Sequence, residues 1–117
     1  MMENIDRKLN KLPSSLDKKY RRLLLYARIS TLAMLNYYKN DGLTYQDIKD
    51  ALKLEDGSLG PNLSWLKKEG YVRAEDTAVE DKTIIVYYIE ESGRKVYAEV
   101  KLWLIDVLHL NETKQIL

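Results

Sequence analysis

A change of hydrophobic period at Gly70 is the feature that most restricts the fold of this chain of 117 residues. Before Gly70, leucines recur over residues 59–66 at the spacing of one helical face. After it, residues 71–74 and 83–89 form β-branched and aromatic runs typical of strands, and the polar stretch 75–82 predicts a loop of several residues between them. The sequence therefore predicts a mainly helical α+β domain with one β-hairpin.

The first half of the chain carries two helical stripes and one capped helix. Apolar residues recur at helical spacing over 16–27 and again over 29–37, which fits either one long helix or two. We favour a break or bend near residues 26–30, because the run 23–27 is apolar on every side. Thr44 and Asp47 then occupy the two positions of a capping box, so a short helix is expected to begin there.

The two remaining helices flank the hairpin. In the first, over residues 58–69, Ser58 is the expected N-cap and Pro61 falls in the first turn, where its missing N–H removes no helical bond. The second follows residues 90–93 and runs to about Leu110. Its apolar surface is wider than one small core requires, so we expect a symmetric dimer that also uses the N-terminal helix. The heptad-like seam assigned to this interface comprises Val96, Val100, Trp103, Val107 and Leu110.

This order of elements resembles a winged helix-turn-helix domain with long N- and C-terminal helices. Four segments carry the resemblance: residues 27–29 at the start of the first core helix, 42–48 at the start of the second, 56–72 along the recognition helix into the wing, and 88–95 at the close of the wing. Over about residues 26–110, the chain resembles the small MarR/ArsR-like transcriptional regulators of archaea. The resemblance implies a homodimeric DNA-binding protein whose recognition helix lies in the major groove.

The predicted organisation has three parts: a basic amphipathic segment 1–25, a winged helix-turn-helix core 26–90 and a dimerisation helix 91–117. The net charge is only +1, but residues 1–28 carry eight Lys and Arg against three acidic residues. Such a basic segment either contacts an anionic partner or forms the solvated side of an amphipathic helix, and the charge alone favours neither.

Side chains for DNA contact are predicted from the face that remains when the leucines of the helix before Gly70 point inward. Ser58 and Asn62 are suited to hydrogen bonds with phosphates or base edges, and an Asn can bind adenine through both amide atoms. Trp65 either stacks on a sugar or base or packs under the wing. The predicted DNA-binding residues are Ser58, Asn62, Trp65, Lys67 and Lys68 in this helix, Lys18, Lys19, Arg21 and Arg22 in the N-terminal segment, and Lys82 in the wing.

Two departures from the family pattern support an alternative function. Gly60 and Pro61 stand where relatives usually carry a Ser-Arg or Ser-Lys pair, which removes a side chain that reads bases or phosphates. Residues 73–83 of the wing sum to a charge of −2, and this charge repels phosphate. The alternative is a winged-helix protein–protein interaction module that has lost DNA binding.

Other classes of protein are disfavoured by what the sequence lacks. The chain has no cysteine and a single histidine, His109, so we expect no catalytic residues, no metal site, no cofactor and no enzyme activity. Its apolar runs are too short for a transmembrane helix, and its first residues lack the layout of a secretion signal. We therefore expect a cytoplasmic protein whose partners are double-stranded DNA and a second copy of itself.

Overall fold

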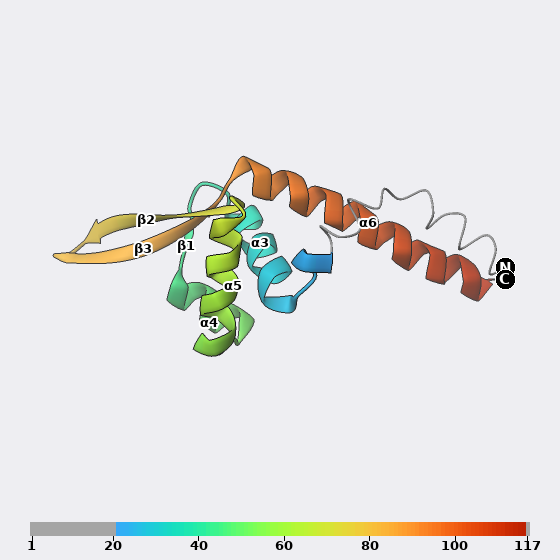
Figure 1. The fold of residues 1–117 in the computed structure, drawn as a ribbon, viewed down its shortest axis with the longest axis horizontal. Coiled ribbons are helices and arrows are strands. Elements are labelled where there is room, and N and C mark those ends of the chain that lie inside the picture. Colours follow the sequence, from blue (N-terminus) through green and yellow to red (C-terminus); the bar gives the residue numbers. More distant parts are fainter. Residues whose placement is uncertain (1–20, 117) are drawn as a thin grey trace.

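Helices predominate in the structure, and a small antiparallel sheet lies beside them (Figure 1). The computed structural model describes the backbone of residues 21–116 and the side chains of residues 21–109, so the first predicted helix, with Lys18 and Lys19, lies largely outside the described residues. The predicted fold class is confirmed. The elements are α3 (Tyr26–Tyr38), β1 (Leu43–Thr44), α4 (Tyr45–Leu52), α5 (Asp56–Lys68), β2 (Val72–Val79), β3 (Lys82–Ile89) and α6 (Glu91–Ile116).

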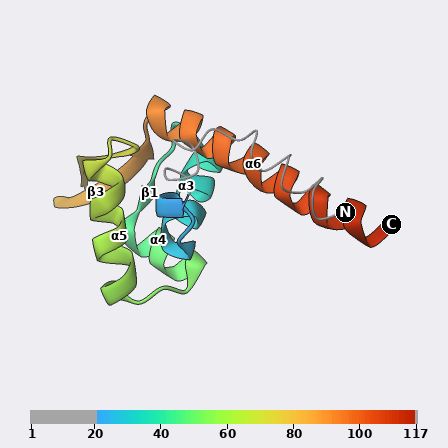
Figure 2. The ribbon, with the colours of Figure 1, turned by 45° about the vertical axis from the view of Figure 1, so that its right-hand side comes forward.

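Helix α3 is the central element of the fold. It lies between α5 and α6 and contacts both of them (Figure 2). Leu32 and Leu35 of α3 are fully buried, and they belong to one core cluster with buried side chains of α4, α5 and α6. The β2–β3 hairpin and α6 extend from this body in opposite directions (Figure 1). One side of α5 is packed against the core, and its other side is exposed to solvent.

A break before α3 is present, but it lies at residues 24–25 instead of the predicted position near residues 26–30. The helical turn at residues 21–23 ends at Leu24, and α3 begins at Tyr26 after an N-cap at Leu25 with extended backbone angles. Leu23 and Ala27 are buried on either side of the break, whereas Leu25 is exposed. The break thus lets residues on both sides of a short apolar run reach the core.

The predicted capping box at the start of α4 is also confirmed. The backbone N–H of Asp47 donates to the Thr44 hydroxyl at 3.1 Å, and the Thr44 N–H donates to the Asp47 carboxylate at 3.1 Å. Leu43 and Thr44 in addition form β1, which pairs antiparallel with β3 and gives the strand order β1-β3-β2. The sequence did not predict this third strand, because two residues show no period.

The start of α5 differs from the prediction. The helix begins at Asp56 with Glu55 as its N-cap, so Ser58 lies inside the first turn and caps nothing. Pro61 is consequently inside the helix, where its missing N–H leaves the Gly57 carbonyl without the usual donor four residues later. An acidic residue in the first turn favours this earlier start through the helix dipole. The three leucines of α5 are buried, as predicted.

The hairpin also differs from the prediction, because its loop has two residues instead of several. Strands β2 and β3 pair over their whole length, from Val72 opposite Ile89 to Val79 opposite Lys82. Both turn residues, Glu80 and Asp81, have positive φ angles of 47° and 65°, which is the backbone of a tight hairpin turn with matching twist. Polar residues misled the prediction, because a two-stranded ribbon exposed on both faces accepts them without losing its backbone hydrogen bonds.

Helix α6 provides core residues at its start and exposed apolar residues farther along. Val96 and Val100 of the predicted dimer seam are 2% and 0% exposed within the chain itself, so they have no surface left for a partner. Trp103 and Val107 are half-buried, and the Leu110 side chain lies outside the described side chains. Within residues 21–116, none of the helices combines the length and apolar character that crossing a bilayer requires.

Candidate nucleic-acid interface

The outer face of α5 is formed by Ser58, Pro61, Ser64 and Lys68. All four residues are exposed, and steps of three and four residues place them opposite the buried leucines. Ser64 was not among the predicted site residues, although its helical spacing from Lys68 and Pro61 is a signal that identifies it. The centre of this face carries only small side chains, so the helix backbone can come close to a ligand.

Asn62 and Trp65, predicted on the outer face, lie instead on a half-buried flank that meets Arg28 at the start of α3. Nε of Arg28 donates a hydrogen bond to Oδ1 of Asn62 at 2.8 Å. The guanidinium carbon lies 3.8 Å from the centroid of the Trp65 ring, a cation–π arrangement. The Trp65 ring also meets Tyr71 edge-on, with 6.1 Å between centroids. Sequence reasoning missed Arg28, because Asn62 is 34 residues away along the chain.

Arg28 also contacts the segment before α3. Its Nη1 donates to the backbone carbonyl of Arg22 at 2.6 Å. Partial burial lowers the pKa of the Arg28 guanidinium, and the negative charge of Glu69 acts in the opposite direction. A guanidinium nevertheless keeps its charge in proteins. One cation therefore connects the end of the N-terminal segment to α5.

A carboxylate already occupies the N-terminal turn of α5. Nζ of Lys49 lies 3.1 Å from Oδ1 of Asp56, and the Tyr45 hydroxyl donates to the same oxygen at 2.9 Å. The hydrogen bond from Lys49, followed by that from Tyr45, lowers the pKa of Asp56. This negative charge suits the positive end of the helix dipole and links α4 to α5.

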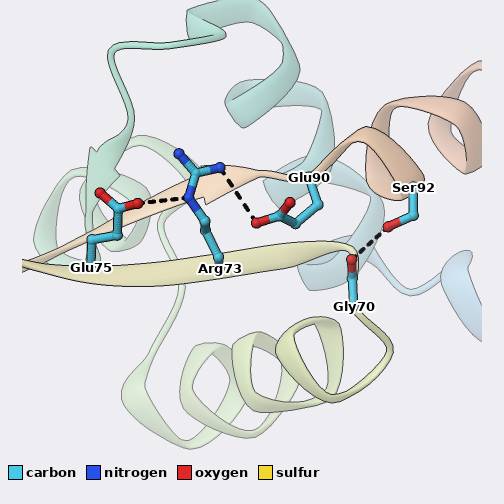
Figure 3. A network of polar contacts seen from close by, with 5 residues as sticks. All are labelled: Gly70, Arg73, Glu75, Glu90 and Ser92. Carbon is cyan, nitrogen blue, oxygen red and sulfur yellow. Dashed lines mark hydrogen bonds and ion pairs between the residues drawn. The ribbon is translucent and has the colours of Figure 1, made fainter.

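Arg73, at the base of the hairpin, is paired within the protein (Figure 3). Its Nε lies 2.8 Å from Oε1 of Glu75, and its Nη1 lies 3.4 Å from Oε1 of Glu90. The guanidinium carbon is 4.6 Å from the centroid of the Tyr88 ring. The hydrogen bond with Glu75 is the main cause that raises the pKa of Arg73. Two carboxylates thus compensate this positive charge, while Lys82 is exposed beside the acidic tip.

The base of the hairpin is fixed to the start of α6. The Ser92 hydroxyl donates to the Gly70 carbonyl (Figure 3), and the Glu90 N–H donates to the Tyr71 carbonyl at 2.8 Å. At Gly93, a Cβ atom would collide with the same Tyr71 carbonyl. Glycine is required there for close approach, and the contact sets the direction of the hairpin.

The remaining predicted cations that the structure describes lie in two exposed groups. Lys67 and Lys68 are exposed in the last turn of α5. Arg21 and Arg22 are exposed before α3, and Lys18 and Lys19 lie outside the described residues. Positive side chains at a helix C-terminus also stabilise the helix dipole, so their position alone does not define a ligand.

Residues 27–108 match the family model of the winged helix DNA-binding domain. The chain belongs to this family. The predicted resemblance is thereby confirmed, with α4 and α5 as the helix-turn-helix and β2–β3 as the wing. Among functionally curated proteins, none matches the sequence.

Solved structures of transcriptional regulators share this winged helix fold. A mutant of MepR from Staphylococcus aureus has a TM-score of 0.68 and 19% identity, over 97% of this chain and 80% of that chain. A MarR-family transcriptional regulator from Silicibacter pomeroyi has a TM-score of 0.58 and 27% identity, over 82% of this chain and 63% of that chain. The S. aureus MepR–DNA complex has a TM-score of 0.63 and 18% identity, over 98% and 94% of the two chains.

Proposed function

We propose that this winged helix protein is a homodimeric DNA-binding transcriptional regulator that places α5 in the major groove. The observation that carries the proposal is the outer face of α5, where Ser58, Pro61 and Ser64 form a narrow exposed surface that ends at Lys68. The major groove is about 12 Å wide and admits one helix. Membership of a DNA-binding family supports the same function, and so does a similar structure solved with DNA.

The proposed contacts divide into groove and backbone contacts. Ser58 and Ser64 supply hydroxyl groups to base edges or phosphates, because both are exposed on the groove-facing side of α5. The cations supply charge to phosphates. This group comprises Lys67, Lys68, Lys18, Lys19, Arg21, Arg22 and Lys82.

The proposed dimer interface is the apolar side of α6 that the chain leaves uncovered. Leu102, Ile105 and Leu108 are 64%, 50% and 60% exposed. Ile105 and Leu108 line a groove of about 260 Å³ between α3 and α6, together with Ile29 and Leu104. A second copy would cover this groove together with the later part of the predicted seam, Trp103, Val107 and Leu110, of which Trp103 also packs against the core. Two copies could then present their α5 helices about 34 Å apart, one duplex turn.

A DNA titration at several salt concentrations tests the proposed function. We expect fluorescence anisotropy with random and selected duplexes to show binding that weakens steeply with salt, because phosphate contacts release counterions. Lys68→Gln should weaken binding to all sequences and reduce the salt slope by about one. Lys95→Gln, at an exposed position of α6, is the charge-matched control and should leave the slope unchanged. A salt-independent titration, or no binding, contradicts the proposal.

One observation favours a second candidate, a protein–protein interaction module. The wing is acidic, and Glu75 and Glu90 compensate the charge of Arg73 at its base. In such a module the winged helix would bind no duplex, selected or random. The same titration therefore separates the two functions.

A further inference from the structure

We infer that Arg28 is a positioning residue that holds α5 against the end of the basic N-terminal segment. The contacts of Arg28 with Arg22, Asn62 and Trp65 are called the clamp below, and Asn62 belongs to this clamp instead of reading a base. The inference rests on the proposed DNA-binding function and deepens it. It concerns how the groove-facing side of α5 is held while phosphate contacts form nearby.

Three parts of the chain meet at the Arg28 guanidinium. Its central carbon lies over the Trp65 ring, its Nε donates to Oδ1 of Asn62, and its Nη1 donates to the Arg22 carbonyl. A planar, delocalised cation can stack and donate in its own plane at once, which an ammonium group cannot do. The first two contacts hold α5, and the third holds the backbone of a residue proposed to bind phosphate.

Both functional atoms of the Asn62 amide are already used. Oδ1 accepts from Arg28 at 2.8 Å, and Nδ2 donates to the Ser58 carbonyl at 2.7 Å. Bidentate recognition of adenine needs the same two atoms. Reading a base would require both hydrogen bonds to break, and the one with Arg28 is strengthened by its charge. Asn62 is therefore suited to link the Arg28 side chain to the first turn of α5.

The side chain of Ser58 lies on the outer face of the helix, and its carbonyl is the acceptor for Asn62. The Asn62 side chain thus reaches back four residues, into the first turn of α5. The chain of contacts from Arg22 through Arg28 and Asn62 thus ends at the residue proposed to face the groove. Loss of the Arg28 contacts would therefore shift the first turn of α5 relative to the DNA, whatever the DNA sequence.

Variants at the two clamp residues test the inference by affinity, salt slope and base preference together. We expect Arg28→Gln to weaken binding to the selected duplex about tenfold, a size typical of contact networks, with an unchanged salt slope. Asn62→Ala should weaken all sequences alike, and the double variant should be no weaker than either single variant. Arg94→Gln, an exposed arginine of α6, is the control and should change none of these values.

Trp65 fluorescence checks the clamp without DNA. In a Trp103→Phe background, Arg28→Gln should shift the Trp65 emission to longer wavelength, because one face of the ring becomes hydrated, while Arg94→Gln should not. An unchanged emission overturns the inference, as does a loss of preference at one base pair in Asn62→Ala. A reduction of the salt slope by about one in Arg28→Gln would instead make Arg28 a phosphate contact. Failure of the unmodified protein to bind any duplex contradicts the proposed function itself.

Discussion

At the scale of residues, the side chains of α5 divide into those that anchor the helix in the core and those that lie on its exposed or half-buried sides. Leu59, Leu63 and Leu66 anchor α5 and were predictable, because their spacing alone turns them to one side. Asn62 and Trp65 were predicted on the outer face, whereas both are half-buried beside Arg28, which is far away in sequence. Periodicity identifies the centre of a buried face, whereas its flanks depend on tertiary contacts.

Truncation of an anchoring leucine tests the packing of α5. We expect Leu63→Ala to lower the free energy of unfolding by about 2–5 kcal/mol, since it leaves a cavity in the core. Ser64→Ala changes the neighbouring exposed residue and should alter stability by no more than about 0.5 kcal/mol. Urea denaturation of both variants provides the comparison. Equal stabilities would show that α5 is rotated from the described position.

The carboxylate at the start of α5 gives a prediction for pH. Asp56 has a lowered pKa in the folded protein, because Lys49 and Tyr45 stabilise its charged form. Its contribution is therefore complete above the unfolded-state pKa, near pH 4, and disappears as pH falls through the folded-state value. A carboxyl NMR titration should give a midpoint below that of a free aspartate, and Lys49→Met should raise it. An unchanged midpoint in Lys49→Met contradicts this pairing.

At the scale of elements, the sequence predicted what local signals determine. The capping box of α4 depends on neighbouring residues and was predicted correctly, whereas the break before α3 was predicted a few residues too late in the chain. Strand β1 depends on pairing with β3, and the first turn of α5 holds Asp56 in an ion pair with Lys49 of α4. The two-residue turn has positive φ angles at Glu80 and Asp81, and because Glu seldom adopts them and no Gly or Asn is present, no turn signal was visible.

The acidic wing tip gives a prediction for DNA affinity. If the wing lies near phosphates, Glu80→Gln combined with Asp81→Asn should tighten binding about threefold at low salt, because two repulsive charges are removed. The gain should shrink as salt is raised, since screening acts on exposed charges. Anisotropy titrations at both salt concentrations measure it. Weaker binding of the double variant would mean that the tip makes favourable contacts.

At the scale of the whole molecule, the helix-turn-helix and the exposed apolar side of α6 form two separate surfaces. The helix-turn-helix and the wing lie at one end of the fold, and the exposed half of α6 extends away from them (Figure 1). Its apolar residues continue beyond the part that the core uses. A chain of this shape can join a second copy along α6 without covering α5, so dimerisation and DNA binding are compatible.

Charges placed on the exposed side of α6 test the dimer. Leu102→Glu combined with Leu108→Glu should give a folded monomer, because both side chains are exposed in the single chain. Lys95→Glu is a control at another exposed position of the same helix. Sedimentation at micromolar concentration should show a dimer for the control and the unmodified protein. A monomeric unmodified protein would show that the apolar side has another occupant.

Amide chemical-shift mapping of the 117-residue chain with a selected DNA duplex tests recognition by α5 most directly. We expect the largest perturbations on α5, at Ser58, Ser64 and Lys68, with further changes at Arg21 and Arg22. Perturbations confined to α6, with residues 58–68 unaffected, would contradict major-groove recognition by α5 and support the protein-interaction alternative.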